Sequence, residues 1–168
     1  MSRTTRRSVF AGLAICALSG VLLSAQAPSA VDKAYLGSWK LNLAKSKYEN
    51  LPTPKSGTRV HEDRGSGFVQ VAQVTINADG STAHSEYVYK PDGKTYPMAG
   101  LNQTGTQRIA LKVVDARTVS YQITMDGKLT LDGKRTLSAD GQTLTNEQTG
   151  KDAKGQPTRS VAVYDKQK

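Results

Sequence analysis

The chain has 168 residues, with 23 basic and 14 acidic side chains, a net charge of +9 and one cysteine. This length suits a single domain with its own hydrophobic core, and one cysteine excludes a disulfide framework or a zinc site built on several thiolates. The positive charge makes nucleic acids and anionic lipid or polysaccharide surfaces the partner classes to be weighed against the rest of the sequence.

Residues 1–27 have the parts of an export signal. Three arginines open the segment, an apolar run covers residues 9–23, and Ala25 and Ala27 form the small-x-small pattern that signal peptidase reads. We predict cleavage after Ala27, by the general secretory route or by the twin-arginine route that the paired arginines also fit. An uncleaved anchor is the weaker alternative, because about 20 apolar residues are needed to span a bilayer.

Cleavage would leave residues 28–168 as a single domain in the periplasm. The net charge would be +6 (20 basic against 14 acidic residues), and Cys16 would leave with the signal peptide. Export disfavours nucleic acid, and the lysines stand beside predicted turns rather than among aromatic residues. An anionic lipid or polysaccharide surface stays open as a partner. The simpler alternative, that the lysines keep the strand edges soluble and unpaired, also stays open.

Turn signals at regular spacing are the strongest feature of the sequence. They are marked by Gly80, Gly93, Gly105, Ala116, Gly127, Gly141 and Gly155. An Asp-Gly pair between alternating apolar and polar segments predicts a β-hairpin, because glycine adopts the positive φ that the tight turn requires. The sequence therefore predicts an all-β protein, an antiparallel up-and-down meander of about 8–10 strands. Such a meander protects its edges by closing into a barrel or by packing as two sheets.

Ten strands are expected, near residues 39–43, 57–64, 67–77, 81–90, 94–98, 106–114, 117–125, 128–138, 142–149 and 157–166. The stretch 46–56 contains two prolines, so we expect it to lie outside the sheet. Val69 and Val71 are out of phase with Val74 and Ile76, which predicts a bulge between the two pairs.

Two arginines stand in phase with apolar residues on late strands. Arg135 shares its phase with leucines at 129, 131 and 137, and Arg159 shares its phase with valines at 161 and 163. Because side chains alternate between the two faces of a strand, both arginines are predicted to lie on a partly apolar face.

No catalytic motif is present in the sequence, which favours a protein that is not an enzyme and has no cofactor. The one combination with metal-binding chemistry is His84 and Glu86, two residues apart on one strand, with His61 from another strand. We expect instead that His84 and Glu86 lie on the outer face, opposite Tyr87 and Tyr89, and that no metal is bound.

The Gly-Ser-Trp at residues 37–39, after a short helical turn at 31–35, resembles the lipocalin signature. The ten-strand meander resembles the related fatty-acid-binding proteins. Residues 161–166 are similar to their last strand, where an Arg-x-Tyr pair binds the ligand carboxylate, but Ala162 takes the place of that arginine. Residues 37–47 are also similar to small exported bacterial proteins of unassigned function. The resemblance implies a calycin-like barrel.

The lipocalin resemblance also implies that an arginine from a late strand stacks over Trp39 and closes one end of the barrel. Arg159 is the first candidate for this plug and Arg135 the second. If Arg135 points into a cavity instead, it would bind an anionic amphiphile. The tyrosines that could line such a cavity, or merely fill the barrel, are Tyr87, Tyr89, Tyr96 and Tyr121.

These features predict an exported barrel that binds a small apolar or amphipathic molecule without a covalent bond. The alternative is an interaction or inhibitor module that acts through its loops on another exported protein. An open apolar cavity would favour the first function, and a filled barrel would favour the second.

Overall fold

The structure, a computed structural model, describes residues 33–101, 105–152 and 154–168. The predicted signal peptide at 1–27 lies outside the described residues. Two short 3-10 helices, η1 (Lys33–Tyr35) and η2 (Leu43–Lys45), flank the first strand, and η1 confirms the short helical turn expected before Trp39. Among the described residues, no helix has the length and apolar character needed to cross a bilayer.

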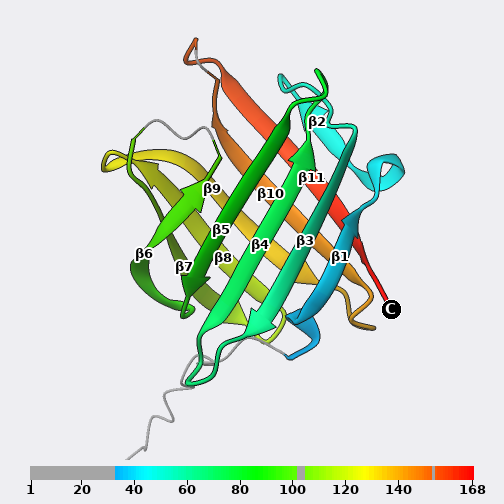
Figure 1. Cartoon of the computed structure of the whole chain (residues 1–168), viewed down its shortest axis with the longest axis vertical. Coiled ribbons are helices and arrows are strands. Elements are labelled where there is room, and N and C mark those ends of the chain that lie inside the picture. Colours follow the sequence, from blue (N-terminus) through cyan, green and yellow to red (C-terminus); the bar gives the residue numbers. More distant parts are fainter. Residues whose placement is uncertain (1–32, 102–104, 153) are drawn as a thin grey trace, which may run out of the picture.

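Eleven strands form one antiparallel sheet (Figure 1). They are β1 (Gly37–Leu41), β2 (Lys47–Glu49), β3 (Ser56–Asp63), β4 (Val69–Ile76), β5 (Thr82–Tyr89), β6 (Asp92–Gly100), β7 (Gln107–Asp115), β8 (Thr118–Met125), β9 (Lys128–Leu137), β10 (Thr143–Lys151) and β11 (Pro157–Lys166).

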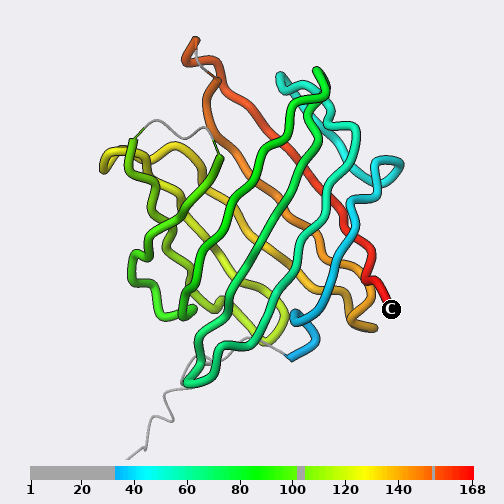
Figure 2. Tube along the Cα trace, viewed as in Figure 1, coloured from blue at the N-terminus to red at the C-terminus, as the bar shows by residue number. Residues whose placement is uncertain are grey.

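The sheet closes on itself as a barrel. From β3 to β11 each strand pairs with the next along the chain, and β1 pairs with both β3 and β11. The tube in Figure 2 shows β3, β4 and β5 as one wall and β8, β9 and β10 crossing behind them. The predicted all-β up-and-down barrel is confirmed, and its closure leaves no long unpaired edge.

The short strand β2 corrects the prediction that residues 46–56 lie outside the sheet. Lys47, Tyr48 and Glu49 pair with the first half of β11, beyond the point where β1 ends. The two prolines follow β2 and stay outside the ladder, as their missing N–H groups require. Two short segments, β1 and β2, therefore share one long partner strand.

Several of the predicted turns form as expected, whereas Gly93 lies within β6 and the turn predicted at 104–105 falls partly outside the described residues. Asp126 and Gly127 have φ angles of 50° and 78°, so both central residues of this hairpin are left-handed, the geometry that favours Asp-Gly. Several turns also begin with an aspartate whose carboxylate accepts a hydrogen bond from the backbone N–H two residues later; the distances are 2.9 Å for Asp79 and 2.8 Å for Asp115. These side chains stabilise the turns locally.

The interior face of the barrel departs from the predicted phases at two places. The register of β4 with β3 and β5 is continuous, so the bulge predicted within β4 is absent. Val74 faces outward, and Gln73 and Thr75 line the interior. On β9, a register shift opposite Ile123 separates Leu129 from the inner face, and Leu129 is 58% exposed.

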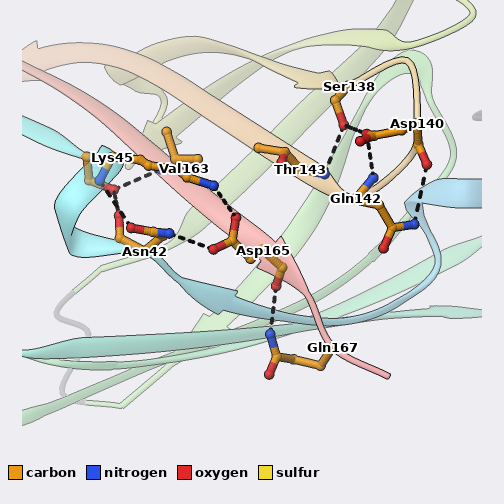
Figure 3. A network of polar contacts seen from close by, with 10 residues as sticks. Asn42, Lys45, Ser138, Asp140, Gln142, Thr143, Val163, Asp165 and Gln167 are labelled. Carbon is orange, nitrogen blue, oxygen red and sulfur yellow. Dashed lines mark hydrogen bonds and ion pairs between the residues drawn. The ribbon is translucent and has the colours of Figure 1, made fainter.

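A polar junction fixes the end of β11 against β1 and η2 (Figure 3). The Asp165 carboxylate accepts hydrogen bonds from Asn42 Nδ2 at 2.6 Å and from Lys45 Nζ at 3.1 Å. Asn42 Oδ1 in turn accepts the backbone N–H of Lys45 at 3.1 Å and so caps η2. The junction supports the closure of the barrel at the point where β1 gives way to β2.

Candidate ligand-binding site

A cavity of about 300 Å³ opens inside the barrel. Its apolar wall includes Leu41, Met98, Ile123 and Leu131, and the loop after β2 contributes Leu51, Pro52 and Pro54. Its polar wall includes Arg59, Gln73, Tyr87, Tyr121, Arg135, Asn146, Gln148 and Tyr164. The cavity thus combines an apolar surface with a small set of polar groups, as small-molecule sites do.

Arg135 on β9 points into the interior and is only 2% exposed. Its Nε donates to Asn146 Oδ1 at 3.1 Å, on the neighbouring strand, and its Nη2 donates to the Tyr87 hydroxyl at 2.9 Å. The guanidinium carbon lies 4.8 Å from the centre of the Tyr121 ring, a cation–π contact. Nη1 is buried and has no hydrogen-bond partner among the described residues.

The space for this arrangement comes from Gly133, which lies opposite Tyr121 across the β8–β9 ladder. A Cβ at this position would come within 2.6 Å of Tyr121 Cζ and would also collide with the Glu147 carbonyl oxygen. Glycine therefore lets the Tyr121 ring lie across β9, where it supports Arg135.

Arg59 on β3 is a second interior arginine, 4% exposed, which the sequence analysis missed. Its Nη2 donates to Gln73 Oε1 on β4, and its guanidinium carbon lies 5.3 Å from the centre of the Tyr164 ring. Nε and Nη1 are buried without a hydrogen-bond partner among the described residues. The sequence of β3 did not indicate that Arg59 faces inward, because the residues in phase with it are Gly57 and His61 rather than apolar residues.

Carboxylates are absent from the described residues that line this cavity. The four ion pairs formed by the described residues join partly exposed side chains and include neither arginine. Both guanidinium groups therefore lie in the barrel with neutral partners only, although burial of a charge without a counter-charge is costly.

The predicted tyrosines are placed at different depths. Tyr87 and Tyr121 line the cavity beside Arg135, as described above. Tyr89 lies away from the cavity wall, with its ring centre 5.8 Å from that of Tyr87. Burial raises the pKa of Tyr89 to about 12, so its hydroxyl is neutral at physiological pH. Burial also raises the pKa of Tyr121, which keeps the aromatic platform under Arg135 uncharged.

Trp39 is fully buried, at 0% exposure, in the core cluster. Its Nε1 donates to the Tyr35 carbonyl oxygen at 3.0 Å, and the Tyr35 hydroxyl donates to the Arg117 carbonyl oxygen at 2.6 Å. The η1 helix is thus tied to the start of β1 and to the β7–β8 turn.

The cation over Trp39 is Lys166, not Arg159. Lys166 Nζ lies 5.1 Å from the centre of the indole ring and donates to the Ala34 carbonyl oxygen at 2.7 Å. Arg159 is exposed on the outer face, where it is the register partner of Glu49 on β2. The prediction that Arg159 plugs the barrel is wrong, because the inward phase of β11 belongs to Ser160, Ala162 and Tyr164.

The three residues considered for a metal site do not come together. His61 is buried in the interior, whereas His84 and Glu86 alternate with the inward-facing Tyr87 and lie on the outer side of β5. Among the described residues, no cluster of three or more His, Cys, Asp or Glu side chains could hold a metal ion. Burial lowers the pKa of His61 well below its usual value, with nearby Arg59 and Arg135 adding to the shift.

No protein-family model matches this chain, and neither does any curated protein. Among solved structures, Rv2717c from M. tuberculosis is similar, with a TM-score of 0.54 and 19% identity, over 81% of this chain and 94% of that chain. The structure of EF1p2_mFAP2b bound to DFHBI gives a TM-score of 0.47 and 11% identity, over 80% of this chain and 94% of that chain. The likeness to Rv2717c supports the barrel fold.

Proposed function

We propose that this protein binds a small amphipathic or apolar molecule non-covalently inside its barrel, and that it does so after export to the periplasm. The observation that carries the proposal is the cavity of about 300 Å³, which has an apolar wall and buried polar groups with unused hydrogen-bonding capacity. Its volume lies at the lower end of the range of about 300–1,000 Å³ for small-molecule sites, which favours a compact ligand.

The same cavity argues against the alternative function. A module acting through its loops has no need for a hollow interior, and close packing would then stabilise the barrel better. The apolar side chains that line the cavity, such as Met98 and Ile123, instead offer contact surface to a bound ligand.

The proposal can be tested with Prodan, a neutral dye whose emission reports on an apolar environment. The variant Leu131→Trp fills the cavity from β9, and Leu129→Trp places the same side chain on the exposed part of the same strand. We expect the wild type and Leu129→Trp to bind the dye alike, and Leu131→Trp to bind it at least about 10-fold more weakly. Equal binding by all three proteins would place the dye outside the cavity, and failure of the wild type to bind Prodan, decanoate or decanol would favour the loop-acting module.

A further inference from the structure

We propose that the ligand of this cavity carries an oxyanion, a carboxylate or a phosphate, which binds between the guanidinium groups of Arg59 and Arg135. This inference rests on the proposed function and names the chemistry of the molecule that the barrel takes up.

The charge of the cavity favours an anionic ligand. A guanidinium stays protonated in proteins, so neither arginine can avoid its burial cost by losing a proton. Both line the cavity, at 4% and 2% exposure, and no carboxylate among the described residues lies in contact with either. Lys166 adds a third positive charge on the interior side of β11. The interior is therefore a cationic environment in which an anion is the complementary group.

The two buried arginines also have unused hydrogen-bonding capacity. Asn146 and Tyr87 accept from Nε and Nη2 of Arg135, and Gln73 accepts from Nη2 of Arg59. Three buried nitrogens have no acceptor among the described residues: Nη1 of Arg135, and Nε and Nη1 of Arg59. An oxyanion offers several acceptor lone pairs to such donors, and charge-assisted bonds of this type are about twice as strong as neutral ones.

The two guanidinium groups are preorganised for binding. Each guanidinium rests on an aromatic ring, Arg135 on Tyr121 at 4.8 Å and Arg59 on Tyr164 at 5.3 Å. Each is also held by a neutral amide from a neighbouring strand, so little side-chain freedom would be lost on binding. The two arginines come from strands far apart in sequence, and the walls of the closed barrel bring them to one cavity.

The cavity also indicates the chemistry of the other end of the ligand. Leu131, Ile123 and Met98 also line the cavity and offer an apolar surface to the ligand. An anionic head with a compact apolar tail matches both parts, whereas a neutral apolar molecule would leave the buried donors without acceptors.

The test uses isothermal titration with decanoate, decyl phosphate and 1-decanol, which share a tail and differ in the head group. The site variants are Arg59→Gln and Arg135→Gln. The matched control is Arg159→Gln, which removes the same charge from the outer face. We expect the wild type to bind at least one of the two anions about 10-fold or more tightly than the alcohol, and each site variant to lose about 10- to 100-fold in affinity for that anion. Affinity for decanol should change little in the site variants, and Arg159→Gln should bind all three compounds as the wild type does.

The two anions distinguish the sources of the head group, since preference for decanoate indicates a carboxylate and preference for decyl phosphate a phosphate. If the wild type binds decanol as tightly as both anions, or if Arg159→Gln lowers anion affinity as much as the site variants, the oxyanion inference is overturned while the proposed function stands. Binding of Prodan but of none of the three compounds would overturn the oxyanion inference alone, and failure to bind Prodan as well would overturn both. If a site variant fails to fold, the comparison of anion and alcohol in the wild type, repeated at high salt, still decides the question.

Discussion

Arg135 Nη2 donates a 2.9 Å hydrogen bond to the hydroxyl of Tyr87, and this contact joins β9 to β5 across the interior of the barrel. The two strands are not neighbours in the sheet, so the bond links opposite walls rather than adjacent strands. It also uses one of the donors of a buried cation that has no ion pair among the described residues. Tyr87 therefore contributes to both the stability of the barrel and the shape of the site.

Replacement of Tyr87 by Phe should lower the free energy of unfolding by about 1.5–3 kcal/mol, because a hydrogen bond to a buried charged donor is lost. Urea denaturation followed by circular dichroism would measure the change. The control is Tyr96→Phe, whose hydroxyl bonds to Asp92 at the surface, 3.0 Å from Oδ2, and which should destabilise the protein less because water can replace the lost partner. Equal losses of unfolding free energy for the two substitutions would show that the hydrogen bond across the barrel contributes no more to stability than the surface one.

Replacement of Gly133 by Ala should destabilise the protein by about 1–3 kcal/mol, because the new methyl group would displace Tyr121 and press on the Glu147 carbonyl. The matched control is Gly57→Ala, whose Cβ would meet Leu41 atoms at 3.4 Å, an ordinary contact distance. Neither glycine has a positive φ, so backbone strain does not enter the comparison. A Gly133→Ala protein as stable as Gly57→Ala would show that Tyr121 and the backbone around β9 shift at little cost to admit the methyl group.

Buried His61, 1% exposed, predicts a specific pH dependence of stability. Burial lowers its pKa in the folded protein, whereas in the unfolded chain the pKa is about 6.5. As the pH falls below about 6.5, the unfolded chain takes up a proton that the folded protein does not. The free energy of unfolding should then fall with decreasing pH, by up to about 1.4 kcal/mol per pH unit.

Denaturation of the wild type and of His61→Leu between pH 5 and 7.5 would measure this contribution. The difference between the two proteins should be flat above about pH 6.5 and should change steadily below it. His84→Gln, which removes the other histidine from the outer face, is the control substitution. Parallel curves for the wild type and His61→Leu would show that His61 titrates equally in both states.

Removal of the buried indole should be among the most damaging single changes. Trp39→Ala is expected to cost about 3–5 kcal/mol, as large aromatic truncations in cores do, and the fluorescence of the native indole should be blue-shifted and poorly quenched by iodide. Arg159→Ala should leave both the stability and the emission nearly unchanged. Free quenching of the native protein would contradict the burial of Trp39.

The export signal is itself a prediction, and it implies a shortened chain. Intact mass of the protein isolated from a bacterial periplasm should correspond to a chain that begins at Pro28, because Ala25 and Ala27 provide the cleavage pattern. Ala27→Leu should block processing, and a substitution outside the pattern, such as Ser29→Leu, should not. A dominant species that retains residues 1–27 would instead indicate an anchor.

The sequence alone was sufficient to predict the strand meander. Turn chemistry and side-chain alternation act over a few residues, so Asp126-Gly127 and the segments around it specify a hairpin wherever they stand. The same local rule placed Tyr87, Tyr121 and Arg135 on their correct faces. The rule failed on β4. Val74 and Ile76 are apolar yet face outward, because the polar Gln73 and Thr75 line the cavity.

Only the tertiary structure decided which side chains meet. A period of two shows which residues share a face, but closure of the barrel and the stagger of its strands determine which rows lie opposite one another. For this reason Lys166 rather than Arg159 covers Trp39, and Arg59 joins Arg135 at one cavity although 76 positions separate them in the sequence. The shift in register on β9 that exposes Leu129 also became visible only in the structure, because it is a feature of the pairing of β9 with β8.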